Sequence, residues 1–219
     1  MKNRTALRIF ESLLKTYGER NWWPAKTRFE VIIGTILAQN VSWRNAKKAV
    51  DSLKKHGLLS LTAIHKLPPD KIAPLIKPSR FYNQKAGKIK QTVEYVMSRH
   101  KGSLNKMFSL GTDVLRRDLL GIKGIGKETA DSILLYAGKK RSFVSDAYTK
   151  RFVLRYGLLK GNPAYDEIRN YFTENIPHDL YIYNEYHALI VHHCYLICRS
   201  KPICSKCTIR RTCRFNKGK

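Results

Sequence analysis

The stretch Gly121-Ile122-Lys123-Gly124-Ile125-Gly126 decides the fold, because it separates two short segments of helical apolar spacing. The segments are residues 113–120 before it and Lys127 to Tyr136 after it. Glycine at positions 124 and 126 permits backbone conformations and close approaches that a side chain would block. The amides that open the second helix can then point at a DNA phosphate. The sequence predicts a helix-hairpin-helix over residues 113–137, and the alternative is an ordinary glycine-capped turn between two helices.

Helical spacing of apolar residues extends over nearly the whole chain, and the sustained alternation typical of strands is scarce. Proline and glycine punctuate the helical segments, as at Pro68-Pro69 and Gly102-Ser103. We therefore expect an all-α protein made of helices of about 8–18 residues joined by short turns. The clearest stripes are Phe10, Leu13, Leu14 and Tyr17; Phe29, Ile32, Ile33, Ile36 and Leu37; and Ala86, Ile89, Val93, Val96 and Met97.

The chain is strongly basic, with 42 Lys and Arg against 16 Asp and Glu and a net charge of +26 over 219 residues. Such a surplus implies an anionic partner, which is nucleic acid, an anionic membrane or an acidic protein. Residues 71–93 contain six basic side chains and no acidic one, and no acidic residue follows Glu185. The aromatic residues among them, such as Phe81 and Tyr195, favour a groove that follows phosphates over a basic surface that serves only solubility.

The apolar runs fall far short of the ~20 residues that cross a bilayer, so we expect no membrane span. The N-terminal residues lack the apolar core of a secretory signal. The 43% of hydrophobic residues suffices for one large domain or two small ones. All five cysteines lie within residues 194–213. This crowding of an odd number of cysteines favours free thiols in a reduced compartment over disulfide bonds. We expect a monomeric cytoplasmic protein associated with the nucleoid.

Four of the five cysteines form the pattern C-x5-C-x2-C-x5-C. Four thiolates this close together can surround one metal centre, and the spacing leaves the choice between zinc and iron–sulfur open. Cys194 lies one helical turn before the first of them and is expected to be a packed thiol rather than a fifth ligand. Basic side chains between the cysteines suggest that this loop meets DNA phosphates. The expected ligands are Cys198, Cys204, Cys207 and Cys213.

The hairpin and the residues after it resemble a known family. Gly124-Ile125-Gly126-Lys127-Glu128-Thr129-Ala130, followed by Val144-Ser145-Asp146 and Arg151, is similar to the hairpin and catalytic-aspartate motif of the endonuclease III superfamily of DNA glycosylases. Gln39-Asn40, the stretch Phe81 to Ala86 and the cysteine pattern fall in the family's order. The resemblance covers essentially the whole chain.

This resemblance implies two helical domains with double-stranded DNA, containing a damaged base, over the cleft between them. Residues 25–135 would form a six-helix barrel that carries the hairpin. Residues 1–24 and 136–219 would form the second domain, with a [4Fe-4S] cluster in the loop 198–213. Relatives have six residues in the first cysteine gap where this chain has five, so the ligand set is expected to be kept in a loop of different geometry.

Asp146 is the catalytic candidate that the resemblance implies. Breaking an N-glycosidic bond passes through an oxocarbenium-like sugar, which a neighbouring carboxylate can stabilise or supply with activated water. From the sequence alone Asp146 could equally be only the N-cap of the next helix. Family members that also nick the strand have a lysine nucleophile where this chain has Glu128, and a carboxylate cannot form an imine. We therefore expect an abasic product, with weak lyase activity at most from Lys127 or Lys123.

All three tryptophans lie within the first 43 residues, where clustering alone would indicate a core. Trp22-Trp23-Pro24 and Gln39 to Trp43, with Pro78 to Ala86 and the hairpin, are similar to the 3-methyladenine DNA glycosylase III branch, whose members can lack the cluster. In that branch the residues at these places wall the pocket for the extruded base. The expected base pocket comprises Trp22, Trp23, Pro24, Trp43 and Glu128.

Chemistry agrees with alkylated purines of the 3-methyladenine and 7-methylguanine type as substrates. These bases are cationic, and a tryptophan face attracts them by a cation–π contact of about 0.5–2 kcal/mol. A cationic leaving group departs with little acid assistance, and a damaged nucleotide is easier to extrude from the stack. The rivals are a glycosylase for hypoxanthine, uracil, mismatched thymine or an oxidised pyrimidine, and a damage-sensing DNA-binding protein without turnover.

The resemblance also implies DNA contacts outside the pocket. Gln39 matches the residue that fills the hole left by the flipped base, and Phe81 matches the wedge that enters opposite it. The alternatives are a helix-end amide for Gln39 and a core aromatic for Phe81, while Asn40 would orient the turn or a phosphate. The hairpin residues expected to contact DNA are Lys123, Gly124, Gly126, Lys127 and Thr129.

Overall fold

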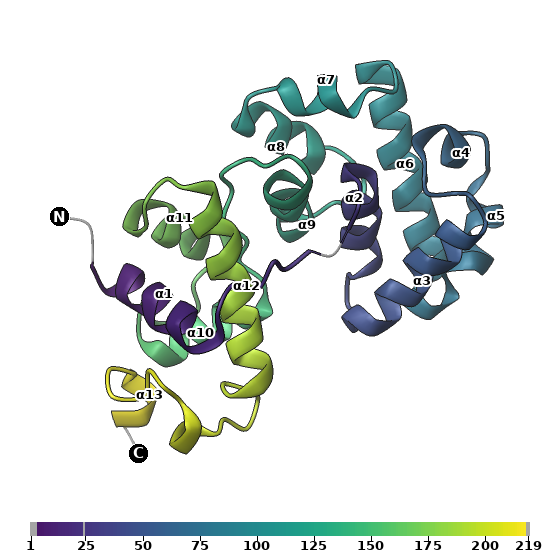
Figure 1. Cartoon of the computed structure of the whole chain (residues 1–219). Coiled ribbons are helices and arrows are strands. Elements are labelled where there is room, and N and C mark those ends of the chain that lie inside the picture. Colours follow the sequence, from purple (N-terminus) through teal and green to yellow (C-terminus); the bar gives the residue numbers. More distant parts are fainter. Residues whose placement is uncertain (1–3, 24, 218–219) are drawn as a thin grey trace. The chain divides into compact units, whose positions relative to one another are not determined.

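The computed structural model describes residues 4–23 and 25–217, and every regular element within these ranges is a helix or a helical turn. The all-α prediction is therefore confirmed (Figure 1). The chain forms two compact units, one of residues Ala25–Lys140 and one of Met1–Pro24 with Arg141–Lys219. Within the described ranges, none of the helices has the length and apolar character needed to span a bilayer.

The predicted boundary after residue 135 lies five residues too early, because residues 136–140 belong to the first unit. Gly138 continues the preceding helical turn by donating from its backbone N–H to the Ile133 carbonyl at 2.9 Å. Lys140 Nζ then donates to the Leu110 carbonyl at 2.6 Å. Both contacts attach the end of this segment to its own unit.

The unit of residues 25–140 is arranged around a buried helix, α2. Phe29 and all residues from Val31 to Leu37 are buried, and α2 contacts α3, α6, α9 and the π-helical turn after α9 (Figure 1). Thr27 begins α2 by accepting a hydrogen bond from the Glu30 backbone N–H at 3.1 Å. The elements are α2 (Arg28–Leu37), α3 (Trp43–Lys55), α4 (Leu61–His65), α5 (Pro69–Ile72), a 3-10 segment η1 (Ala73–Ser79), α6 (Tyr82–His100), α7 (Leu104–Ser109), α8 (Thr112–Leu120), α9 (Lys127–Ser132) and the π-helical turn η2 (Ile133–Ala137).

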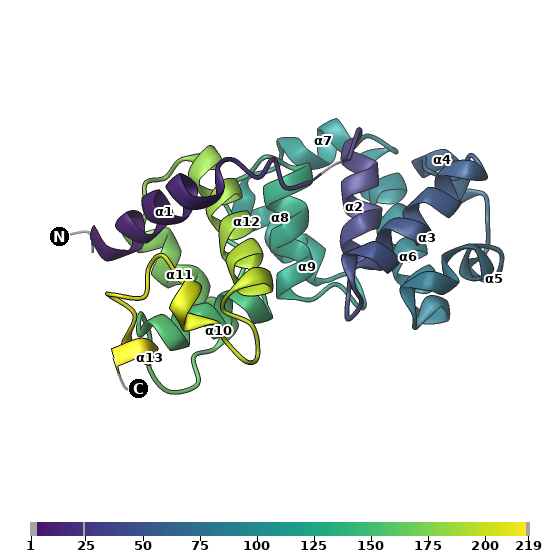
Figure 2. The same cartoon turned by 60° about the horizontal axis from the view of Figure 1, so that its bottom comes forward.

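The other unit is built around α12, which contacts α1 and α10 (Figure 2). The Tyr186 hydroxyl of α12 donates to the Ala6 carbonyl at 2.8 Å and so ties the N-terminal helix to this unit. Phe143 stacks on Phe172 with ring centroids 4.1 Å apart, next to the same tyrosine. The elements are α1 (Arg4–Tyr17), α10 (Ala147–Tyr156), α11 (Tyr165–Asn175), α12 (Leu180–Leu196), a 3-10 turn η3 (Cys204–Lys206) and α13 (Arg214–Lys217).

Candidate functional site

The predicted hairpin forms, with α8 ending at Leu120 and α9 beginning at Lys127. Gly124 has a φ of +88°, and a Cβ there would lie 2.6 Å from Cε of Lys88. Glycine is therefore required at this position both by the backbone conformation and by the side chain packed against it. Lys123, Gly124, Gly126 and Lys127 are all exposed, so the turn presents its backbone and two cations to solvent.

The two helices of the hairpin are joined by an ion pair that the sequence analysis missed. Arg116 Nε and Nη2 of α8 donate to the two carboxylate oxygens of Asp131 in α9 at 2.8 and 3.0 Å. The Asp131 side chain is fully buried and that of Arg116 is 16% exposed. This two-point geometry fixes both distance and orientation between the helices, so the hairpin is a preformed element.

Gln39, just after α2, contacts two other residues that were predicted to bind DNA. Its Nε2 donates to the Thr129 hydroxyl at 2.8 Å and to the Gly124 carbonyl at 3.4 Å. Lys88 Nζ of α6 donates to the Gln39 Oε1 at 2.6 Å. In the sequence Lys88 stands out only as one of the six basic residues of the stretch 71–93. The structure adds it to this group, because it contacts both Gln39 and the surface of Gly124.

Phe81 stands on the surface at the start of α6, where 57% of it is exposed, so the alternative of a core aromatic is excluded. Arg80 and Phe81 have φ values of +53° and +44°, a conformation unusual for such residues. Behind them the buried Lys85 Nζ donates to the carbonyls of Leu37 at 2.8 Å and Ser79 at 2.5 Å. Burial, with repulsion from Lys88, lowers the pKa of Lys85 to about 8.

Asp146 is both a helix cap and a largely buried carboxylate. Its Oδ1 accepts the Thr149 backbone N–H at 2.7 Å and so begins α10. Its Oδ2 lies 3.4 Å from His187 Nε2 of α12, and 15% of the Asp146 side chain is exposed. Burial alone would raise the pKa of Asp146, but the hydrogen bond and charge of His187 and the Thr149 N–H hold it below its usual value. The carboxylate is therefore kept ionised away from bulk water.

The tryptophans expected in the base pocket are distributed over both units. Trp22 and Trp23 are half-buried in the segment that follows α1. Trp43 is the first residue of α3 and is 39% exposed, and Glu128 is exposed in the first turn of α9. Pro24, the remaining residue predicted for the pocket, lies outside the described residues.

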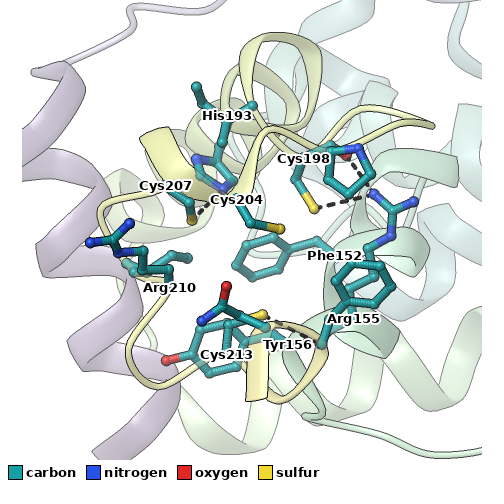
Figure 3. A pocket seen from close by; sticks show the side chains of 14 residues that line it. Phe152, Arg155, Tyr156, His193, Cys198, Cys204, Cys207, Arg210 and Cys213 are labelled. Atoms are coloured by element: carbon teal, nitrogen blue, oxygen red, sulfur yellow. Dashed lines mark hydrogen bonds between the residues drawn. The ribbon is translucent and has the colours of Figure 1, made fainter. Parts of the chain in front are cut away.

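The four predicted cysteine ligands line one pocket, and their sulfur atoms lie around it (Figure 3). Hydrogen bonds from the Cys194 thiol and from Arg155 lower the pKa of Cys198 to about 6. Cys194 itself is buried, and its Sγ lies 3.5 Å from the Tyr148 carbonyl oxygen. Across the described ranges, no three His, Cys, Asp or Glu side chains are close enough to share a single metal ion.

Two arginines of α10 hold the beginning of the cysteine loop. Arg151 Nε donates to the Cys198 carbonyl at 2.9 Å, and Arg155 Nη2 donates to the Ser200 carbonyl at 2.8 Å. Arg155 Nη1 also lies 3.6 Å from the Cys198 Sγ. The helix that Asp146 caps is thus the same helix that supports the loop.

The preformed hairpin places the chain among the helix-hairpin-helix proteins. Residues 33–178 match the HhH-GPD superfamily of base excision DNA repair proteins, and the chain belongs to this superfamily. It is a DNA glycosylase of the endonuclease III superfamily, which confirms the predicted family, enzyme class and DNA partner.

Curated relatives and solved structures agree with this membership. The chain is 47% identical over 208 residues to a Methanocaldococcus jannaschii protein named as a DNA repair glycosylase, with 94% of each chain covered. It is 32% identical over 194 residues to endonuclease III of Sulfolobus acidocaldarius, with 87% of this chain and 84% of that one covered.

Two solved structures are similar to this chain in fold. The H. pylori 3-methyladenine DNA glycosylase bound to 1,N6-ethenoadenine has a TM-score of 0.76 and 28% identity, covering 86% of this chain and 96% of that one. A trapped endonuclease III–DNA covalent intermediate has a TM-score of 0.83 and 17% identity, covering 100% and 99%, which shows the shared fold.

The ion pair in the hairpin gives a first prediction. Asp131→Ala removes the fully buried carboxylate from this pair and leaves the mostly covered Arg116 without that contact, and breaking one side of a buried pair destabilises a protein by about 3–5 kcal/mol. Urea unfolding should show this loss. Asp113→Ala, at an exposed position in the first turn of α8, is the matched control and should change stability by about 1 kcal/mol or less. Equal, small effects of both substitutions would contradict the role assigned to the pair.

Proposed function

We propose that this protein removes alkylated purines, of the 3-methyladenine and 7-methylguanine type, from double-stranded DNA by hydrolysing the N-glycosidic bond. The observation that carries the proposal is the Asp146 carboxylate, which is largely buried and held by Thr149 and His187 in its ionised form. A fixed negative charge of this kind stabilises the cationic sugar that forms as the base leaves.

The aromatic residues Trp22, Trp23 and Trp43 are the proposed walls of the base pocket. A flat, electron-rich indole face binds a cationic purine by stacking and by cation–π attraction. Because the positive charge also makes the base a good leaving group, this pocket needs little acid assistance. The similarity to the H. pylori enzyme, whose name specifies 3-methyladenine, supports this substrate class.

The product is an abasic site in an intact strand. Glu128 occupies the place of the lysine that strand-nicking relatives use, and its carboxylate cannot form the imine that initiates nicking. Lys127 beside it is exposed in the same turn and is the residue from which residual lyase activity would come.

DNA binding is proposed to use the exposed hairpin turn and the surface residues near it. The backbone of Gly124 and Gly126, with Lys123 and Lys127, would bind phosphates without regard to sequence. Gln39 would enter the hole left by the extruded nucleotide, and the exposed Phe81 would wedge the opposite strand. Lys88 and Thr129 contact the Gln39 side chain and would set its direction before DNA binds.

The four cysteines fit a [4Fe-4S] cluster better than a single zinc ion. A zinc ion needs four sulfur atoms about 2.3 Å from one point, whereas among the described residues no three of the Cys and His side chains lie close enough to share one ion. Cys198, Cys204, Cys207 and Cys213 would hold the cluster as thiolates, and the lowered pKa of Cys198 favours that form. When bound, the cluster joins four positions of the loop into one rigid centre.

The function is tested by Asp146→Asn on a duplex with a 7-methylguanine. Asparagine is an equally good N-cap, so the substitution removes the charge and keeps the helix. Base release should fall about 100- to 1000-fold, while the affinity for duplex DNA should stay at the wild-type value. Asp179→Asn, which makes the same change at the N-cap of α12, is the control and should be fully active. Unchanged release in Asp146→Asn would contradict the assignment of the catalytic group.

A second prediction concerns the pH dependence of base release. Because His187 lowers the pKa of Asp146, His187→Gln should raise that pKa. Activity requires the ionised carboxylate, so the loss of activity on acidification should begin at a higher pH in the variant. Single-turnover rates between pH 4 and 8 measure this shift, and exposed His178→Gln serves as the control. Superimposable pH profiles would exclude the proposed coupling.

A third prediction concerns the metal. Purified protein should be brown and contain roughly four iron atoms and four sulfide ions per chain. Cys207→Ala should lose most of this iron, whereas Cys194→Ala should retain it because Cys194 is packed against the Tyr148 carbonyl. Colourless protein with stoichiometric zinc would overturn the cluster assignment, and equal iron loss in both variants would overturn the ligand set.

A further inference from the structure

Helix α12 carries a buried carboxylate that the proposed reaction does not use. Glu185 is 4% exposed and lies among neighbours that are mostly aromatic or aliphatic, from Tyr183 to Val191. A charge in such a place is strongly unfavourable unless it is paired or hydrogen-bonded. Its retention therefore calls for specific partners.

Its partners are two successive backbone amides. The Arg20 N–H donates to the Glu185 Oε2 at 2.6 Å, and the Asn21 N–H donates to the Oε1 at 3.1 Å. Both oxygens are thus used, and both bonds are of the stronger, charge-assisted kind. The donors are 165 and 164 residues away along the chain.

These amides belong to the irregular segment that leads into the two adjacent tryptophans. Helix α1 ends at Tyr17, and Gly18 leaves it with a φ of +67°. Asn21 has a φ of +45°, in the left-handed region that asparagine tolerates better than most residues. Trp22 and Trp23 follow directly, so the hydrogen bonds to Glu185 set the direction in which the backbone presents them.

We propose that Glu185 is a positioning residue of the base pocket, holding the segment 18–23 so that Trp22 and Trp23 are ready to receive the extruded base. The proposal rests on the function proposed above for these tryptophans. Glu185 acts on the backbone of the segment and is assigned no contact with the substrate. By ordering the pocket wall before the base arrives, it reduces the ordering required on binding.

Other contacts already attach α1 to α12, so Glu185 is not needed to hold these two helices together. The Tyr186 hydroxyl donates to the Ala6 carbonyl at 2.8 Å, and the ring of Tyr186 packs 5.4 Å from that of Phe10. The Glu185 carboxylate, in contrast, accepts hydrogen bonds from two amides of the segment after α1. Their removal should therefore release the tryptophans and leave the rest of the unit intact.

The test compares Glu185→Gln with wild type. A glutamine has one acceptor oxygen in place of two, and its amide NH2 would face a backbone N–H, so at least one hydrogen bond is lost. Single-turnover release of an alkylated purine at saturating enzyme should fall about 10- to 100-fold, and affinity for undamaged duplex should be unchanged. Glu174→Gln, at an exposed position of α11 in the same unit, is the matched control and should match wild type.

A second readout does not depend on catalysis. In a Trp43→Phe background, with excitation that selects tryptophan over tyrosine, the emission comes from Trp22 and Trp23, because the chain has three tryptophans. In Glu185→Gln, acrylamide should quench the fluorescence of these two tryptophans more strongly. Hydrogen exchange at the backbone amides of residues 20 and 21 should also be faster. Glu185→Asp keeps the charge but places it one methylene group further from the two amides. Acrylamide quenching of the two tryptophans in this variant should therefore lie between those of wild type and Glu185→Gln.

The outcomes separate the two proposals. Wild-type excision and wild-type quenching in Glu185→Gln would overturn the positioning role, as would a parallel loss of duplex affinity and thermal stability in both Glu185 variants. If wild-type protein releases no alkylated purine while Glu185→Gln still exposes the tryptophans, the substrate proposal fails and the hold of Glu185 on the segment is supported.

Discussion

An ionised carboxylate held largely out of water is the constraint on which the unit built around α12 depends. Asp146 remains charged there because the Thr149 N–H donates to its Oδ1 and His187 Nε2 lies 3.4 Å from its Oδ2. The bond from Thr149 begins α10, and a cap of this kind contributes about 0.5–2 kcal/mol to helix stability. The alternatives of cap and catalytic group are therefore compatible, since the same side chain has the geometry for both.

The consequences of that constraint extend along two helices. Helix α10 continues from Asp146 to Arg151 and Arg155, which hold the carbonyls at the start of the cysteine loop. The middle of helix α12 is buried from Glu185 to Val191 and carries polar groups that each meet a different segment: Glu185 binds the segment before the tryptophans, and His187 lies beside Asp146. Because both Glu185 oxygens accept hydrogen bonds, this residue favours one arrangement of the segment that it binds.

Local patterns predicted much of this architecture from the sequence. Apolar spacing gave the helical class, and the glycines of the 121–126 turn gave the hairpin, whose conformation at Gly124 requires glycine. The boundary near residue 135 was wrong because a π-helical turn keeps the following residues with the hairpin unit, and helical spacing does not distinguish such a turn from a regular end.

The residues whose roles the sequence did not predict have partners that are distant in the sequence or uncharged. Glu185 binds backbone amides, Lys88 binds a glutamine side chain, and Asp131 finds Arg116 across the hairpin. Such pairings exist only once the helices are packed, so residue spacing carries no signal of them. The roles of Gln39, Phe81 and the tryptophans in DNA remain predictions from resemblance, although the exposure of Phe81 removes its alternative as a core residue.

We propose that a pocket of aromatic faces with one fixed carboxylate releases cationic bases and leaves the strand intact. A single panel of duplexes tests it, each with one 3-methyladenine, 7-methylguanine, hypoxanthine, uracil, mismatched thymine or oxidised pyrimidine, assayed with and without borohydride. We expect the two methylated purines to be released fastest, with an alkali-labile abasic product and no efficient borohydride-trapped adduct. Preferred release of an uncharged base, or efficient covalent trapping, would contradict the account.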